Sequence, residues 1–384
     1  MELIAKTLYG LENILAGELA LLGASKVRIA NRAVGFEGGK ELLYEVNYMS
    51  ATALSVLKKI AGFKIKSSDD LYNKAKEIPW DKFMNRKSTF AVVPVVSSSL
   101  FRHSGFPALR VKDAIADYFR EKYGLRPDVD KNNPQIIIHL HISNDDVTLS
   151  LDSSGEPLFK RGYRKASVQA PLNEVLAAGM LRLSGWNASE VLIDPMCGSG
   201  TIPVEAAMMA AGIPPAFARK SFGFELWPDY DRDLFRKIKE KHNAKTGKPG
   251  TVNIFGYDIS ERAVQIASAN AERAGTGKWI LFEVKDFMDL KSGVKNGTLI
   301  LNPPYGERMS AGEPDSLYSA IGTALKHNFE GFTAWIITPS EGPVKHIGLK
   351  PSEKHILFNG AIECRFLKFE LYGGSKKKNT PNIS

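Results

Sequence analysis

The chain has 384 residues, 43% of them hydrophobic and 24% charged, and its net charge is +9. This length and composition exclude an intrinsically disordered chain and allow two or three compact domains. The sequence contains no run of about 18 apolar residues and no signal peptide, which argues against a membrane-spanning or secreted protein and predicts a cytoplasmic one.

The first 155 residues combine short strands and helices without a long parallel series. This pattern indicates small α+β modules. The predicted strands lie in ELIAKTLYG (2–10), KVRIANRAVGFEG (26–38), TFAVVPVV (89–96) and QIIIHLHISNDDVTLSLDSS (135–154), and the predicted helices are GLENILAGELALLG (10–23) and FPALRVKDAIADYFREKYG (106–124).

The basic excess lies mainly in this first part, where 25 basic and 19 acidic residues occur up to Lys165. Such a surface suits a polyanion, which it would bind through phosphate contacts and counterion release. A solvated charged surface would explain the charge alone about as well. The candidates for phosphate contacts are Lys58, Lys59, Lys64, Lys66, Arg86, Lys87, Arg102, Arg110 and Lys112.

A polar segment with prolines, residues 153–171, suggests a domain boundary near 160 to 170. Beyond it, short apolar runs alternate with helical patterns, beginning with a helix at 173–186 that Asn173 can cap. This alternation predicts parallel strands with crossover helices. The strand candidates are residues 190–194, 252–258, 279–286, 297–302 and 332–338.

Two last strands, 355–359 and 362–372, are separated only by Gly360 and Ala361 and therefore form a hairpin. Five parallel strands followed by an antiparallel hairpin outline an α/β sheet of the class I (Rossmann-like) methyltransferase type. A dinucleotide-binding fold lacks that hairpin. The lysine-rich end, residues 375–384, is expected to be a disordered tail.

A glycine-rich turn follows the first strand of this sheet, in DPMCGSGTIP (194–203). Open α/β sheets bind ligands at this position, and Gly198 and Gly200 allow close backbone approach. A nicotinamide cofactor would fit such a turn, but Pro203 occupies the third glycine position. Asp194 supplies the acid that a cofactor with an amino-acid end needs, so S-adenosylmethionine is favoured.

The next two strands also end in acids. Asp258 is placed to accept bonds from two ribose hydroxyls, and Asp286 can accept one from an adenine amino group while Phe287 packs on the ring. Any one such acid is more often a helix cap or turn former. Three in succession at the correct edge favour a cofactor site, whose full predicted set is Asp194, Met196, Cys197, Gly198, Gly200, Thr201, Asp258, Ile259, Asp286, Phe287 and Asn302.

The two cysteines and seven histidines predict neither a disulfide framework nor a metal site. His139 and His141 would share one face of a strand, but a pair without a third ligand is more often structural. Cys197 is interpreted as a small turn residue, because a nucleophile would have to be a thiolate aimed at the substrate ring. Cys364 is expected in the core.

The most specific short motif is Asn302-Pro303-Pro304-Tyr305, directly after the fourth strand. An exocyclic amino group on a purine is a poor nucleophile because its lone pair is delocalised. The Asn302 side-chain oxygen and the Pro303 carbonyl can accept its hydrogens and stabilise the growing positive charge. The prolines stiffen the loop and Tyr305 can stack on a flipped base. A proline-rich turn with an aromatic plug is the simpler alternative.

These motifs, DPMCGSGT, GYDIS, KDF and NPPYGER in this order, resemble those of the THUMP-domain RNA methyltransferases, and most of all the bacterial 23S rRNA guanine-N2 methyltransferase family. The resemblance implies a ferredoxin-like portion at 1–60, a THUMP RNA-binding domain at 45–155 and a methyltransferase domain at 165–374. It implies Asp194, Gly198, Asp258 and Asp286 as cofactor contacts and Asn302, Pro303 and Tyr305 as the amino-group site. Some family members carry a second methyltransferase domain, whose activity is not expected of this sequence.

The resemblance also implies a guanine N2 target in 23S rRNA, or a precursor of the large ribosomal subunit as partner. NPPY by itself does not distinguish guanine N2 from adenine N6. A tRNA guanine-N2 methyltransferase, a DNA adenine methyltransferase and a noncatalytic RNA-binding assembly factor stay open, although no DNA-reading motif is recognisable.

Overall fold

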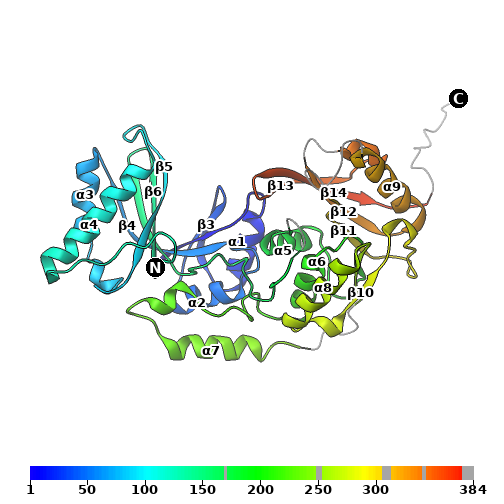
Figure 1. Ribbon diagram of the computed structural model, residues 1–384, viewed down its shortest axis with the longest axis horizontal. Coiled ribbons are helices and arrows are strands. Elements are labelled where there is room, and N and C mark those ends of the chain that lie inside the picture. The colour runs from blue at the N-terminus through cyan, green and yellow to red at the C-terminus, as the bar shows by residue number, and fades with distance from the viewer. Residues whose placement is uncertain (168–170, 248–252, 305–312, 340–342, 374–384) are drawn as a thin grey trace. The chain divides into compact units, whose positions relative to one another are not determined.

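A computed structural model describes residues 1–167, 171–247, 253–304, 313–339 and 343–373 (Figure 1). The chain divides into two compact units: unit 1 comprises Met1–Gly162 and Ile213–Thr246, and unit 2 comprises Tyr163–Gly212 and Gly247–Ser384. The backbone therefore passes between the units three times. Within the described residues, no helix is long and apolar enough to cross a membrane.

Unit 1 is built on one seven-stranded sheet with the order β2-β3-β1-β4-β7-β6-β5. All neighbours pair antiparallel except β5 and β6, which are parallel. The strands are β1 (Glu2–Lys6), β2 (Ser25–Ala30), β3 (Ala33–Glu37), β4 (Ser55–Lys64), β5 (Phe90–Ser97), β6 (Ile136–Ser143) and β7 (Asp146–Asp152). The helices are α1 (Glu12–Leu21), α2 (Lys40–Met49), α3 (Ser68–Lys76), α4 (Gly105–Tyr123) and α7 (Arg232–Asn243), with short 3-10 turns at Trp80–Lys82 and Gly223–Leu226.

Strand β4 is the one described strand of unit 1 that the sequence did not predict. Its central residues include Lys58, Lys59 and Gly62, and its burial does not alternate along its length, so it lacks the period of a half-buried strand. It pairs with β1 on one side and β7 on the other, Leu57 lying opposite both Ile4 and Asp152. The expected small modules therefore share one sheet and one hydrophobic core.

Residues 213–246 lie between the two stretches of unit 2 in the sequence, but they belong to unit 1. Helix α7 begins at the Asp231 cap, whose side chain accepts from the N–H of Leu234, and packs on α2 (Figure 1). Phe224 stacks on Tyr44 with 4.3 Å between ring centroids, and Phe235 meets the same ring edge-on at 5.7 Å. From the sequence we expected one continuous methyltransferase domain at 165–374 and did not predict this insertion.

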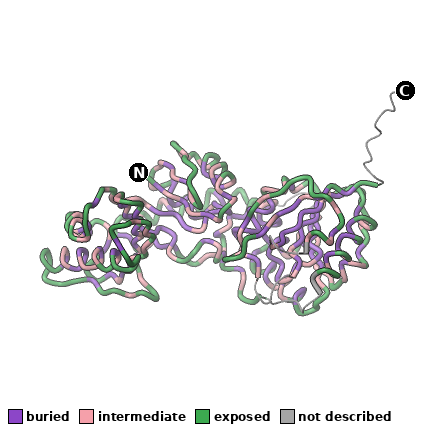
Figure 2. The backbone as a smooth tube through the Cα atoms, turned by 90° about the horizontal axis from the view of Figure 1, so that it is seen from above, coloured by how far each residue is buried: buried purple, intermediate pink, exposed green. Residues whose placement is uncertain are grey.

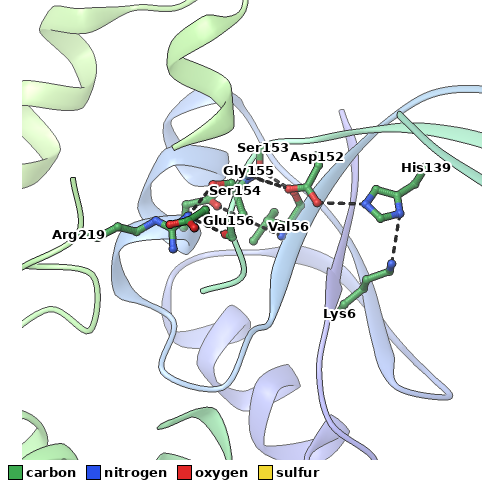
Figure 3. A network of polar contacts seen from close by, with 10 residues as sticks. Lys6, Val56, His139, Asp152, Ser153, Ser154, Gly155, Glu156 and Arg219 are labelled. Atoms are coloured by element: carbon green, nitrogen blue, oxygen red, sulfur yellow. Dashed lines mark hydrogen bonds and ion pairs between the residues drawn. The ribbon is translucent and has the colours of Figure 1, made fainter. Parts of the chain in front are cut away.

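Figure 3 shows a polar network in unit 1 that starts on β1 and reaches the inserted segment. His139 lies between Lys6 and Asp152, with Nδ1 3.3 Å from Lys6 Nζ and Nε2 3.0 Å from Asp152 Oδ2. Asp152 Oδ1 accepts from the N–H of Ser154 at 2.8 Å. The Arg219 guanidinium in turn donates to the carbonyl of Ser154 at 2.8 Å. His139 thus has a structural partner on each ring nitrogen.

Unit 2 confirms the predicted α/β sheet of five parallel strands with a terminal antiparallel hairpin, in the order β10-β9-β8-β11-β12-β14-β13. The strands are β8 (Leu192–Asp194), β9 (Ile254–Asp258), β10 (Ile280–Val284), β11 (Thr298–Leu301), β12 (Thr333–Pro339), β13 (Glu353–Asn359) and β14 (Ile362–Glu370). Figure 2 shows buried backbone in the middle of this unit inside a layer of exposed residues.

Helices cover the unit 2 sheet and bring the strand ends to a common edge. They are α5 (Glu174–Leu183), α6 (Thr201–Ala211), α8 (Glu261–Arg273) and α9 (Glu313–Asn328), with 3-10 turns at Gly277–Trp279, Phe287–Asp289 and Pro343–Ile347. The Asn173 side chain caps α5 by accepting from the N–H groups of Val175 and Leu176. Helix α9 places Tyr318, Ile321 and Leu325 in a cluster with β8 and β11 residues.

Candidate active site

A cavity of about 660 Å³ lies in unit 2 where β8, β9, β10 and β11 end. Ligands of parallel α/β sheets bind at this edge, and the volume is that of a small-molecule site. The lining residues are Pro171, Leu172, Asp194, Pro195, Met196, Cys197, Gly198, Ser199, Thr201, Ile202, Asp258, Ile259, Ser260, Ala263, Asp286, Phe287, Met288, Asn302, Pro304 and Leu317.

The turn between β8 and α6 depends on two glycines with positive φ, +54° at Gly198 and +79° at Gly200. Gly198 lines the cavity. A Cβ on Gly200 would lie 2.8 Å from the Cβ of Ala267, so α8 could not pack this close against any other residue. Gly200, which the sequence predicted as a cofactor contact, is not a lining residue and instead allows the turn and α8 to meet.

Asp258 organises the second strand end. Its Oδ2 accepts the N–H of Gly198 at 2.9 Å and its Oδ1 accepts the N–H of Ser260 at 2.9 Å. The first bond joins the glycine turn to β9, and the second forms the entry to α8. Each carboxylate oxygen has further lone pairs, so the group can still accept bonds from ligand hydroxyls.

Asp194 is fully enclosed at the base of the cavity, with 2% of its surface exposed. Burial raises the pKa of its carboxyl well above the usual value of 3.8, and the charge of Asp258 raises it further, against one bond from the Met196 N–H. A cation bound beside the two acids would favour the ionised form of Asp194. The ammonium group of an amino-acid moiety is such a cation.

The third strand end carries Asp286 and Phe287, both of which line the cavity. Asp286 Oδ1 accepts the N–H of Met288 at 2.9 Å and so caps the turn that follows. The Phe287 ring is 2% exposed and stacks on Phe329 with 5.7 Å between centroids. It forms part of a fixed apolar wall.

At the fourth strand end, Asn302 follows β11 and lines the cavity. Its Oδ1 is buried and has no hydrogen-bond partner among the residues that the structure describes. A buried amide oxygen without a partner costs free energy, about 1–3 kcal/mol, which a ligand that donates to it would recover. Pro304 lines the cavity, Pro303 is buried but is not a lining residue, and Tyr305 lies outside the described residues.

Several lining residues were not predicted. Pro171 and Leu172 come from the segment before α5, and Leu317 comes from α9, each far in sequence from the strand ends. Their apolar side chains carry no chemical signature that a motif could reveal. Ser199, Ser260 and Met288 adjoin predicted positions and could have been inferred by extending each motif by one residue.

The cysteines do not supply a nucleophile in this geometry. Cys197 and Cys364 are both buried and free. Burial raises the pKa of the Cys197 thiol well above its usual value, and the charges of Asp194 and Asp258 raise it further, so the thiol stays protonated. Across the described ranges, no group of three or more His, Cys, Asp or Glu could hold a metal ion.

Comparison with known proteins identifies the whole arrangement. Residues 161–368 match the family described as RMKL-like, methyltransferase domain, and this match covers more than half of the chain. The chain belongs to the RMKL-like methyltransferase family. Its first part matches the RlmL ferredoxin-like domain over residues 2–57 and the THUMP domain over 66–152, as the motif resemblance implied.

Relatives of this RMKL-like methyltransferase cover nearly all of its length. It is 39% identical to the ribosomal RNA large subunit methyltransferase K/L of Syntrophotalea carbinolica over 94% of this chain and 52% of that protein. It is 38% identical to slr0064 of Synechocystis sp., provisionally named an RNA methyltransferase, over 94% of this chain and 95% of that protein. The chain thus spans about half the length of the K/L relatives and nearly all of the Synechocystis one.

Two solved structures share the complete fold. A structure titled a possible methylase from Clostridium difficile 630 has a TM-score of 0.88, is 32% identical and covers 98% of this chain and 99% of its own. SMU.472, provisionally described as a methyltransferase and complexed with S-adenosylhomocysteine, has a TM-score of 0.86, is 27% identical and covers 97% and 99%.

The RMKL-like methyltransferase uses S-adenosylmethionine, and the cavity fits this cofactor. In this cavity, Asp194 and Asp258 would face an ammonium group, Asp258 would have acceptor positions left for ribose hydroxyls, and Asp286 would add an acceptor beside an apolar wall. The predicted cofactor contacts Asp194, Met196, Cys197, Gly198, Thr201, Asp258, Ile259, Asp286, Phe287 and Asn302 all line this one cavity.

Proposed function

We propose that this chain transfers the methyl group of S-adenosylmethionine to the exocyclic N2 amino group of a guanosine in 23S rRNA. The observation that carries the proposal is the buried Oδ1 of Asn302 in the wall of the cofactor cavity, which has no partner among the described residues. A buried acceptor of this kind is suited to a substrate N–H group.

The proposed role of Asn302 follows from the weak nucleophilicity of the amino group. Its lone pair is delocalised into the purine ring, and an acceptor aimed at its hydrogen localises that pair on nitrogen. When bound, the cofactor supplies an electrophilic methyl on a sulfonium. Asn302 Oδ1 would accept one amino hydrogen and stabilise the positive charge that grows on nitrogen. The Pro303 carbonyl is proposed as the second acceptor, and Tyr305 as the stacking partner of the flipped base.

No strong general base is needed in this scheme: the amine nitrogen would form its bond to the methyl carbon as the carbon–sulfonium bond breaks, and the acidic N–H that results would give its proton to solvent water. The protein contributes alignment and fixed dipoles. Asp258 and the Gly198 N–H hold the glycine turn at the cavity, and Asn302 at the end of β11 would orient the amine. Pro304 lies in the cavity wall and has no backbone N–H that could compete for the Asn302 oxygen.

An RNA substrate is proposed from the THUMP match and from the names of the K/L relatives. The ion pairs of unit 1 reduce the set of basic residues that are candidates for RNA contacts. Five of the nine basic residues are paired with acids, namely Lys58 with Asp229, Lys59 with Glu2, Lys64 with Asp145, Arg110 with Asp69 and Lys112 with Asp113. Among the described residues, Lys66, Arg86, Lys87 and Arg102 have no such ion pair. They are the better candidates for phosphate contacts.

The direct test measures methyl transfer. Purified protein is incubated with labelled cofactor and, separately, with 23S rRNA, a large-subunit precursor and total tRNA, followed by mass analysis of the nucleosides. We expect N2-methylguanosine in 23S rRNA and its loss from the rRNA of a deletion strain. A cytoplasmic location follows from that substrate.

The alternatives give other products. Transfer to tRNA alone would favour a tRNA guanine-N2 methyltransferase, and N6-methyladenine as product would contradict the guanine assignment. Binding of RNA without any transfer, together with no heat of binding for S-adenosylmethionine, would indicate a noncatalytic assembly factor.

A further inference from the structure

Arg164 lies next to the cofactor cavity without lining it, and its guanidinium joins two parts of the cavity wall. One nitrogen, Nη2, donates both to the carbonyl of Leu172 and to Oγ1 of Thr201, each at 2.8 Å. Leu172 and Thr201 are lining residues that come from different elements, the segment before α5 and the first turn of α6. A single side chain thus connects two walls of the cavity that lie far apart in the sequence.

The charge of Arg164 is itself held in place. Its Nε lies 3.3 Å from Oε1 of Glu174, the first residue of α5, and the two side chains are 15% and 5% exposed. Nε makes an ion pair with Glu174 but no hydrogen bond among the described residues, so the carboxylate holds the guanidinium by charge in a partly desolvated setting. The planar fork of arginine can reach an acid, a carbonyl and a hydroxyl together, which an ammonium group cannot do in the same geometry.

Hydrogen bonds also attach the residues on either side of Arg164, namely Tyr163 and Ala166, to helices α6 and α8. The Tyr163 hydroxyl donates to Oε1 of Glu205 on α6 at 3.0 Å, and both residues are buried. The fully buried Asn270 on α8 donates from Nδ2 to the carbonyls of Ala166 and Ser199, at 3.2 and 3.0 Å. The chain around Arg164 is therefore anchored to α6 through Glu205 and to the glycine turn through Asn270 and Ser199, which lines the cavity.

We propose that Arg164 is a positioning residue for cofactor binding: it sets the spacing between the Leu172 wall and the first turn of α6, and thereby the width of the cavity above the glycine turn. Arg164 does not line the cavity, and it acts through Leu172 and Thr201. The proposal rests on the cofactor site alone and is independent of which base or which RNA is methylated.

The test is calorimetric titration of S-adenosylmethionine and S-adenosylhomocysteine, without RNA, into the full chain carrying Arg164→Lys. Lysine keeps a positive charge, but its single nitrogen cannot both stay beside Glu174 and take the position of Nη2, from which both wall contacts are made. We expect Kd to rise about tenfold, equivalent to about 1.4 kcal/mol, with an unchanged circular dichroism spectrum. In the methylation assay, KM for the cofactor should rise by the same factor, while kcat stays within about twofold.

Arg182→Lys, at an exposed arginine of α5, is the matched control and should leave Kd unchanged. Thr201→Val removes one of the two acceptors, and Arg164→Lys combined with Thr201→Val should weaken binding less than the product of the two single effects. Arg164→Lys with a folded chain and a Kd within twofold of the unaltered protein overturns the proposal, as does a loss of kcat at unchanged Kd. Absence of N2-methylguanosine in rRNA bears only on the proposed substrate.

Discussion

The backbone N–H of Gly198 donates to the Asp258 carboxylate across 2.9 Å, and this bond joins the turn after β8 to the end of β9. It holds the glycine turn in its left-handed conformation before any ligand is bound. Asp258 therefore supports the turn beside it, and we propose that it also accepts hydrogen bonds from the cofactor.

Asp258→Ala should therefore weaken cofactor binding by more than the loss of ligand contacts alone. We expect Kd for S-adenosylmethionine to rise at least about tenfold, since a hydrogen bond to a charged group contributes about 1.5–3 kcal/mol. Calorimetry measures the effect, with Asp289→Ala as a control at an exposed acid of the same unit. A normal Kd for Asp258→Ala would refute this assignment.

Asn302→Ala should lower kcat while cofactor affinity changes little, because its Oδ1 is proposed to act on the amine. Loss of one dipole that stabilises transition-state charge typically costs about 10²–10³ in kcat. Single-turnover methylation and calorimetry separate the two effects. Asn302→Asp keeps an acceptor oxygen and should retain more activity than alanine. Equal losses of turnover and of cofactor affinity would undermine the proposed role.

Cofactor binding should strengthen with rising pH as Asp194 ionises. Burial favours the protonated acid in the free protein and raises its pKa well above 3.8, whereas a bound ammonium group favours the carboxylate. The folding stability of the free protein should change in the opposite direction. The contribution of Asp194 to the free energy of unfolding is complete below pH 3.8 and is lost as the pH rises through its raised pKa. Calorimetric Kd values across pH should show the trend, and Asp194→Asn should flatten it. A pH-independent Kd in the unaltered protein would contradict the assignment.

Arg219→Ala should destabilise unit 1. Its guanidinium donates to the carbonyls of Ser154, Glu156 and Pro157 at 2.6 to 2.9 Å and anchors the inserted segment to the chain after β7 (Figure 3). The expected loss is about 1–3 kcal/mol in the free energy of unfolding, measured by urea titration. The neighbouring exposed Lys220→Ala should be nearly neutral, and equal effects of the two substitutions would disprove the anchor.

RNA binding should distinguish the unpaired from the paired cations of unit 1. Replacing Arg86, Lys87 and Arg102 by glutamine should weaken binding across RNA sequences and lower the slope of log K against log salt by about one for each phosphate that the variant no longer binds. The matched control is Lys64→Gln, because Lys64 is already paired with Asp145 and Asp146. A larger effect of the Lys64 substitution would reverse the assignment.

The sequence predicted the unit 2 sheet because buried parallel strands form continuous apolar runs that end in turn residues, as in β11 and Asn302. The carboxylates of the site followed from their place after those strands. Local patterns did not predict β4, because its lysines are atypical of a strand in the middle of a sheet. They also did not predict that α7 belongs to unit 1. The apolar face of an amphipathic helix shows that the helix packs on a hydrophobic core, but not which of the two cores it packs on. Leu172 and Leu317 reach the cavity through tertiary packing alone.

The insertion of residues 213–246 into unit 1 has a consequence for how related proteins can exchange parts. The module that would meet the nucleic acid is encoded in two separate stretches, with part of the catalytic module between them. A recombination event that swapped only the codons of Met1–Gly162 would bring in an α2 whose aromatic face must fit a foreign α7. An exchange that keeps the core of unit 1 intact therefore has to include both stretches.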